Sequence, residues 1–222
     1  MEAIPDQIER ALVVTGGDPW SGPLPQFGAA IARVVAADSG VELALQLGLP
    51  INTVIGDLDS APAEALREAE RLGATLDRHA PDKDETDLEL ALDLVCGEGA
   101  RDVVVVGGVG GRLSHLIGIA TLLANEKYAD VRIVWLLPQA TVHIANPSRA
   151  VSVDGAIGDL LSLIPVGGGA VGVTTSGLKW SLHEDDLPTT STRGISNRML
   201  AERVDVSLQS GTLLVIHEEN QK

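Results

Sequence analysis

The chain has 222 residues, enough for one large domain or two small ones, and 45% of them are hydrophobic, which is ample for a core. Only 2% are aromatic, so Val, Leu, Ile and Ala must fill the interior. With 31 acidic residues against 16 basic ones, the formal net charge is -15, which disfavours binding to nucleic acid or to an anionic membrane surface. A phosphate-bearing ligand would therefore need local help from a cation such as Mg²⁺ or from placed basic groups.

Targeting signals are not expected. The first ten residues are acidic and polar, so we expect no secretory signal, and the apolar runs are shorter than the ~20 residues that cross a bilayer. Cys96 is the only cysteine, and we expect an inert thiol on the apolar side of a helix. These features predict a protein of the reducing cytoplasm.

The first part of the chain predicts an α/β domain. Up to about Pro138, short β-rich runs alternate with helical patterns, which is typical of a mainly parallel sheet flanked by helices. The predicted strands are 11–15, 33–37, 52–55, 75–79, 102–106 and 131–137, and the predicted helices are 26–31, 41–47, 63–72, 87–96 and 113–126. We assign this domain to residues 1–138.

The second part predicts an all-β, sandwich-like domain over residues 139–222. No helix-length amphipathic pattern occurs there, and runs of Val, Ile and Thr are broken by Gly, Pro, Asn and Asp. The predicted strands are 141–145, 150–153, 160–164, 171–175, 178–182, 203–208 and 212–216.

Carboxylates gather where the third predicted strand ends, in Ile55-Gly-Asp-Leu-Asp-Ser60. If the chain is still extended there, Asp57 and Asp59 project to one side of it and repel each other unless a cation lies between them. Mg²⁺ prefers such oxygen ligands, together with water and phosphate. The alternative is that Asp59 or Ser60 caps the helix that begins near Pro62.

A second acidic stretch, Asp82-Lys-Asp-Glu-Thr-Asp87, precedes the fourth predicted helix. Thr86-Asp-Leu-Glu89 also reads as a capping box, which would explain one residue of the stretch without any ligand. Capping leaves Asp82 and Asp84 unexplained. Asp38, which follows the second predicted strand, has the same two interpretations, a ligand-site carboxylate or the N-cap of helix 41–47.

A glycine loop, Val106-Gly-Gly-Val-Gly-Gly-Arg112, joins a predicted strand to a predicted helix. Glycine lets the backbone approach a phosphate closely, and helix N-termini attract anions. The loop is not a dinucleotide fingerprint, because Leu113 stands at the third glycine position, and the chain has no Walker A pattern. A purely structural glycine turn is the alternative, although Arg112 is placed where it could face a ligand.

Taken together, these stretches resemble the thiamine pyrophosphokinase family over nearly the whole chain. The resemblance lies in six ordered motifs: Ala37-Asp-Ser-Gly40, Gly56-Asp-Leu-Asp-Ser60, Asp82-Lys-Asp-Glu-Thr-Asp-Leu-Glu89, Gly110-Gly-Arg-Leu-Ser-His115, Ser176-Gly-Leu-Lys-Trp-Ser-Leu182 and Gly194-Ile-Ser-Asn197. The family fold is an α/β domain followed by a β-sandwich in a homodimer. This agrees with the α/β and all-β domains predicted from the sequence.

The resemblance implies a reaction and a set of residues. Thiamine would attack the β-phosphorus of ATP, giving thiamine diphosphate and AMP with the help of Mg²⁺. The implied metal and nucleotide site consists of Asp38, Asp57, Asp59, Thr86 and Asp87, with Lys83 and Arg112 as candidates for phosphate contacts. Of these, we expect Asp57, Asp59, Asp87 and Arg112 to be catalytic and Asp38, Asp57, Asp59 and Asp87 to hold the metal.

Thiamine is expected in a cleft between subunits of the homodimer, against Ser176, Trp180, Ser196 and Asn197 of the second domain. Without the resemblance, Trp180 would be read as a core aromatic on a strand. The sequence does not identify the general base. His115 has a suitable pKa range, but it would serve equally well as a hydrogen-bonding residue at the start of a helix.

The chain departs from the family pattern at two positions. Ser114 stands where the family usually has Asp, which removes a carboxylate from the active-site loop, and Ser39 replaces a glycine, which is a milder change. The first departure keeps two alternatives open: a diphosphokinase for another alcohol such as a hydroxymethylpterin, and a nucleotide-binding protein of the same fold without turnover.

Overall fold

The computed structural model describes residues 9–22, 25, 27 and 30–220. The chain divides into two compact units, one formed by residues 1–119 with 135–138 and the other by 120–134 with 139–222. The predicted boundary at residue 138 stays a prediction. No helix in the described part of the chain is long and apolar enough to cross a membrane.

The first unit is built on parallel strands in the order β4-β3-β2-β1-β5. Its elements in chain order are β1 (Arg10–Thr15), β2 (Arg33–Ala37), α1 (Gly40–Gln46), β3 (Thr53–Gly56), α2 (Ala63–Arg71), β4 (Thr75–Arg78), α3 (Asp87–Gly97), β5 (Asp102–Gly107) and the start of α4 (Leu113–Leu123). The α/β fold class is therefore confirmed, and most predicted boundaries agree to within a residue or two.

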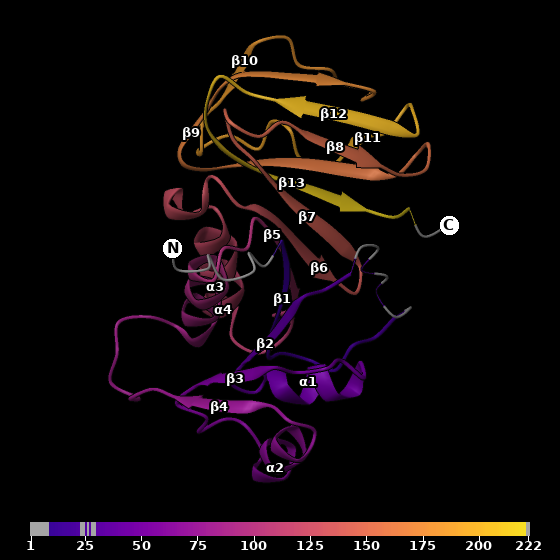
Figure 1. The fold of residues 1–222 in the computed structure, drawn as a ribbon. Coiled ribbons are helices and arrows are strands. Elements are labelled where there is room, and N and C mark those ends of the chain that lie inside the picture. Colours follow the sequence, from indigo (N-terminus) through magenta and orange to yellow (C-terminus); the bar gives the residue numbers. More distant parts are fainter. Residues whose placement is uncertain (1–8, 23–24, 26, 28–29, 221–222) are drawn as a thin grey trace, which may run out of the picture. The chain divides into compact units, whose positions relative to one another are not determined.

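Helices cover both faces of this sheet, and the central strands β1 and β2 are buried and apolar on both faces from Ala11 to Val14 and from Val34 to Ala37. Leu12 and Val14 of β1 belong to a core that includes Val41 and Ala44 of α1, whereas the alternate residue Val13 faces the other way. α3 packs against β1, β2 and β3. Figure 1 shows α1 and α3 on opposite sides of these strands. Burial on both faces holds the strands firmly in position. The acidic residues follow directly after the strand ends.

Helix 26–31 was predicted but is not present in its described residues. Phe27, Ala30 and Ile31 have no helical structure, and the other members of the range lie outside the described residues. Predicted helix 113–126 ends earlier, at Leu123, and a 3₁₀ turn, η1 (Glu126–Tyr128), follows Asn125, whose side chain accepts a hydrogen bond from Lys127 N. β6 (Arg132–Leu137) comes next.

The second unit is an antiparallel β structure in the order β7-β13-β9-β12-β8, with β10 and β11 also paired to β9. Its strands are β7 (Ala140–Ala145), β8 (Val151–Asp154), β9 (Leu160–Ser176), β10 (Asp185–Leu187), β11 (Asn197–Arg198), β12 (Arg203–Ser207) and β13 (Ser210–Glu218). Figure 1 draws them from dark red through orange to yellow. The predicted all-β character of this part of the chain is confirmed.

Two strand predictions in this unit were wrong. Ranges 160–164 and 171–175 form one strand, β9, because pairing with β13 continues across the glycines between them, with a register shift at Gly211. Range 178–182 is not a strand. Its backbone is held by residues near β11, with Leu178 bridged to Met199 and Lys179 N donating to Arg198 O.

Gly40, the first residue of α1, should be intolerant of a side chain, because a Cβ there would overlap the carbonyl oxygen of Val14 in β1. We expect Gly40→Ala to lower the free energy of unfolding by roughly 1–3 kcal/mol, the usual cost of overpacking. Denaturant unfolding followed by circular dichroism measures this.

Gly97→Ala is the matched control, because a Cβ at the last residue of α3 meets nothing within 4 Å. Alanine is the better helix former, so this variant should be neutral or slightly stabilised. Equal stability of the two variants would contradict the close contact between α1 and β1.

Candidate active site

The acidic site is built from two adjacent strand ends. β2 and β3 are parallel with Ala37 opposite Ile55, so the residues that follow them emerge at the same edge of the sheet. Asp38 N donates to Ile55 O at 2.9 Å, which ties the two ends together. The next residues of both strands are therefore brought close without any ligand.

Unusual backbone conformations aim the carboxylates. Asp38 has φ +46° and Leu58 has φ +62°, both in the left-handed region that side chains other than glycine seldom adopt. Leu58 is 5% exposed and belongs to the core, so its burial turns its two neighbours outward. Asp59 N donates to Asp57 Oδ1 at 3.2 Å, which closes the turn.

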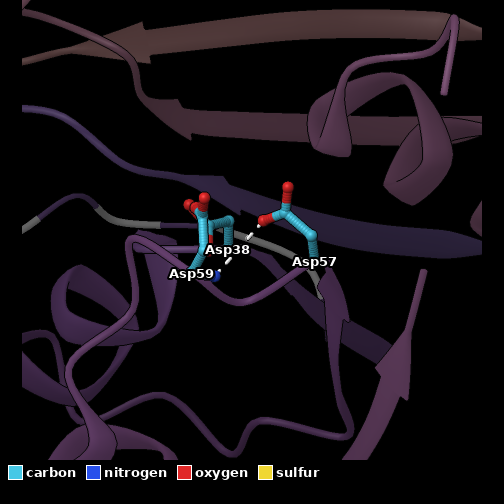
Figure 2. A group of neighbouring side chains, drawn as sticks. All are labelled: Asp38, Asp57 and Asp59. Atoms are coloured by element: carbon cyan, nitrogen blue, oxygen red, sulfur yellow. Dashed lines mark hydrogen bonds between the residues drawn. The ribbon is translucent and has the colours of Figure 1, made fainter. Parts of the chain in front are cut away.

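Asp38, Asp57 and Asp59 each place one carboxylate oxygen within 4.8 Å of the others. Figure 2 shows the three carboxylates directed to the same side of their loops. The expected reason for this proximity was wrong, because the chain is not extended between Asp57 and Asp59; β3 ends at Gly56 and the turn at Leu58 brings them together.

The second acidic stretch contributes two side chains to this edge. Lys83 Nζ lies 3.0 Å from Asp87 Oδ1 and 3.7 Å from Asp57 Oδ2. Asp87 approaches the end of β3 closely because residue 56 is a glycine at φ +141°, where a Cβ would lie 2.8 Å from the Asp87 carboxylate. Thr86 is the N-cap of α3 and its Oγ1 accepts from Glu89 N at 3.2 Å. Asp82 and Asp84 are exposed.

The electrostatics of the three clustered carboxylates differ. Burial, reinforced by the negative charges of Asp87, Asp57 and Asp59, raises the pKa of Asp38. The backbone N–H of Asp59, with help from the Lys83 ammonium, lowers the pKa of Asp57. Within the described residues, Asp38 Oδ1 is buried and accepts no hydrogen bond. A buried carboxylate oxygen without a donor, next to two more carboxylates, suits a hard divalent cation.

The glycine loop lies at the same edge of the sheet but further along it. It follows β5, and the strand order places β1 between β5 and β2, so two strand spacings, about 10 Å, separate it from Asp38. Arg112, Ser114 and His115 are exposed at the start of α4. No interaction found among the described residues joins Arg112 to the clustered carboxylates.

Asp18, which was not predicted from the sequence, lies beside the glycine loop. Asp18 N donates to Val109 O at 2.7 Å, and a Cβ on Gly110 would overlap the Asp18 carboxylate. The Gly16-Gly17 pair just before Asp18, at the end of β1, was the available signal. Asp18 therefore supplies a carboxylate beside the glycine loop.

The candidate thiamine residues all lie in the second unit. Asn197 is buried, and its side-chain amide bonds both backbone groups of Trp180, accepting from its N–H at 3.1 Å and donating to its carbonyl at 2.8 Å. The Trp180 side chain is 55% exposed, so the reading of Trp180 as a core aromatic on a strand was wrong. Lys179 Nζ lies 4.7 Å from the indole centroid.

The two serines are placed differently. Ser196 is exposed with φ +57°, and its N–H donates to Ser162 Oγ at 3.0 Å. Ser176, at the end of β9, donates from Oγ to Asp205 Oδ2 at 3.2 Å, and Ser152 Oγ donates to the other oxygen of Asp205 at 2.6 Å. Asp205 was not predicted, because an acidic residue at an exposed strand position carries no sequence signal.

Fold and site define a protein with a cluster of carboxylates at the carboxyl edge of a parallel sheet, followed by an antiparallel β unit with an exposed indole. A model of the thiamin pyrophosphokinase catalytic domain matches residues 26–135, and one of the thiamin pyrophosphokinase vitamin B1 binding domain matches residues 143–213. The chain belongs to the thiamine pyrophosphokinase family, as its motifs indicated.

Individual relatives agree with this assignment. A thiamine pyrophosphokinase of Bacillus subtilis (strain 168) is 26% identical over 182 residues, which cover 82% of this chain and 85% of that protein. The crystal structure of a thiamin pyrophosphokinase from Geobacillus thermodenitrificans has a TM-score of 0.80 at 28% identity, covering 96% of this chain and 99% of that one. A Bacillus subtilis structure at 24% identity, covering 96% of this chain and all of that one, has a TM-score of 0.83 and shows the same fold.

Asp38→Asn should stabilise the metal-free protein, because it removes a charge from a partly buried position surrounded by like charges. We expect a gain of roughly 0.5–1 kcal/mol at neutral pH, as for other charge optimisations on partly exposed groups. Unfolding in EDTA measures it, with exposed Asp84→Asn as the control that should change nothing.

The pH dependence of this gain follows from the raised pKa of Asp38. Below the ordinary value of 3.8 both the folded and unfolded states are protonated, so the gain vanishes. It develops as the pH rises through that value and is complete above the raised pKa of the folded state. A loss of stability in Asp38→Asn at neutral pH would refute this account.

Proposed function

We propose that this protein catalyses ATP-dependent pyrophosphoryl transfer to thiamine, yielding thiamine diphosphate and AMP. The observation that carries the proposal is the convergence of Asp38, Asp57 and Asp59 inside the segment matched by the family's catalytic domain. The match of a vitamin B1 binding domain to the second unit supports thiamine as the acceptor.

In this reaction the primary hydroxyl oxygen of thiamine forms a bond to the β-phosphorus of ATP. The bond between the β-phosphorus and the oxygen bridging it to the α-phosphate breaks, and AMP leaves with that electron pair. The hydroxyl proton passes to a general base. Such transfers depend mainly on positioning and charge neutralisation.

The carboxylates of Asp38, Asp57, Asp59 and Asp87 are proposed to hold Mg²⁺ together with the phosphates. The buried oxygen of Asp38 that accepts no hydrogen bond from the described residues supports this assignment. When bound, Mg²⁺ would supply positive charge against the phosphate oxygens. Thr86 positions Asp87 by capping α3, and Arg112 would contact phosphate from the glycine loop.

For thiamine, we propose that its cationic thiazolium ring rests on the exposed Trp180 indole. Lys179 already lies over this ring, which supports its ability to accept a cation. Asn197 fixes the Trp180 backbone and Ser176 presents a hydroxyl held by Asp205, so the surroundings of the ring are ordered before a ligand arrives. Ser196 would line the same site.

The decisive assay follows AMP release from ATP. We expect AMP only when thiamine and Mg²⁺ are both present, and we expect Asp57→Asn and Asp59→Asn to lower kcat at least roughly 100-fold with an unchanged circular dichroism spectrum. Asp84→Asn, from the same acidic region, is the control and should keep most of the activity.

Near wild-type rates of both variants at saturating Mg²⁺ would defeat the metal-site assignment. AMP release with a hydroxymethylpterin but not with thiamine would defeat the acceptor assignment. Binding of ATP without turnover of any alcohol would point to a nucleotide-binding protein.

We also propose that the active form is a cytoplasmic homodimer, because the family's thiamine cleft lies between subunits. Three apolar side chains of the second unit, Trp180, Ile195 and Leu200, are 50–58% exposed, which supports a partner surface there. Sedimentation at micromolar concentration should show a dimer under assay conditions. A fully active monomer would overturn this part of the proposal.

A further inference from the structure

The Lys83 ammonium forms ion pairs with two of the candidate metal-binding carboxylates, Asp57 and Asp87. It lies 3.0 Å from Asp87 Oδ1 and 3.7 Å from Asp57 Oδ2, and it donates to the carbonyl of Ala80 at 3.2 Å. The contact to the Ala80 carbonyl is a hydrogen bond, and the two carboxylates are ion-pair partners of the ammonium. The Lys83 side chain is only 14% exposed. In this arrangement the Lys83 ammonium is directed at carboxylates of the protein itself.

This placement conflicts with the roles that the sequence suggests. Asp57 and Asp87 are the carboxylates assigned to the divalent cation, and Lys83 is the side chain assigned to phosphate. A divalent cation bound by Asp57 and Asp87 would lie next to the Lys83 ammonium, and like charges at such distances repel strongly where water is partly excluded. One of the two cations must therefore move away from these carboxylates.

We propose that Lys83 is a resident counter-ion that is exchanged for the divalent cation. In the free protein its single charge partly offsets the charges of Asp57 and Asp87; when the metal–nucleotide complex binds, the metal takes over these carboxylates and the Lys83 ammonium turns to the phosphates. This inference rests on the metal site of the proposed function and adds the order in which charges are exchanged there.

The surroundings of Lys83 allow such a movement. It lies in the connection between β4, which ends at Arg78, and α3, which begins at Asp87. Asp82 and Asp84 on either side of it are exposed, so a change of side-chain rotamer displaces no core residue. Lysine is a compact charge on a flexible four-carbon stem, which suits a group that changes partners.

The exchange makes metal and nucleotide binding cooperative. Without nucleotide, the metal must displace Lys83 with no new partner for the ammonium, so its affinity is reduced. With nucleotide present, the phosphates accept Lys83 and the penalty disappears. Couplings of this kind between two ligands typically amount to about 5–150-fold in affinity.

The test measures Mn²⁺ binding to the nucleotide-free protein by electron paramagnetic resonance. Mn²⁺ prefers the same oxygen ligands as Mg²⁺ and is observed directly. Lys83→Gln should lower the Kd for Mn²⁺ by about five-fold or more, the low end of such couplings. Lys83→Arg keeps the charge and should bind Mn²⁺ no more tightly than the wild type.

Lys127→Gln is the matched control for net charge. It removes the same charge from an exposed lysine whose ammonium lies 4.9 Å from the Tyr128 ring centroid, outside the acidic cluster. Its Kd for Mn²⁺ should stay at the wild-type value. An equal tightening in Lys83→Gln and Lys127→Gln would reduce the effect to overall charge and overturn the exchange.

Thermal stability provides a second readout that does not depend on turnover. In EDTA, Lys83→Gln should melt below the wild type because Asp57 and Asp87 lose their counter-ion, and Mn²⁺ should raise its melting temperature more than that of the wild type. A variant that folds only with Mn²⁺ shows this rescue in its extreme form. One that stays unfolded at every Mn²⁺ concentration overturns the proposal.

The outcomes separate this inference from the proposed function. An unchanged or higher Kd for Mn²⁺ in folded Lys83→Gln overturns the exchange even if thiamine-dependent AMP release is found. A lower Kd in a protein that releases no AMP with thiamine supports the exchange and defeats the substrate assignment. No saturable Mn²⁺ binding by either protein overturns the exchange.

Discussion

The site depends on holding like charges together at the end of a parallel sheet. Three carboxylates each place an oxygen within 4.8 Å of the others, and Asp87 approaches Asp57 through Lys83. Like charges at such distances repel one another. The buried strands on either side, the backbone N–H groups and Lys83 must together offset this repulsion, and a bound divalent cation would remove most of it.

Backbone geometry provides the other part of this support. Left-handed residues other than glycine are uncommon and strained, yet Asp38 and Leu58 both adopt that conformation at neighbouring strand ends. Leu58 is anchored in the core and Asp38 N is bonded to Ile55, so packing and hydrogen bonding hold the strain in place. Gly56 completes the arrangement by leaving room for the Asp87 carboxylate. The carboxylates are therefore positioned before any ligand binds, which reduces the reorganisation that binding requires.

The sequence predicts most of the first unit because its strands are continuous apolar runs separated by helical patterns. Such elements are determined by the local sequence, so they can be predicted without knowing the tertiary contacts. It predicts the acidic positions but not their geometry, since the turn at Leu58 depends on the burial of that side chain rather than on its neighbours. It fails where pairing or side-chain bonding is long-range: β9 continues through its glycines because β13 pairs with it, and Trp180 lies on a loop because Asn197 holds it. Asp18 and Asp205 were missed for the same reason, as only the folded chain places them beside Gly110 and Ser176.

The net charge of -15 and the position of Lys83 together influence which form of the nucleotide can bind. A free nucleotide triphosphate is repelled by such a protein, whereas its complex with a divalent cation carries less negative charge and offers the carboxylates a partner. A cationic acceptor such as thiamine is attracted by the same field. Because Lys83 partly offsets the charges of Asp57 and Asp87 beforehand, the site need not recruit a divalent cation before the nucleotide comes, and the cation that enters can arrive already bound to phosphate. The acidic surface and the Lys83 ammonium thus favour the same species, the metal–nucleotide complex, over either of its components.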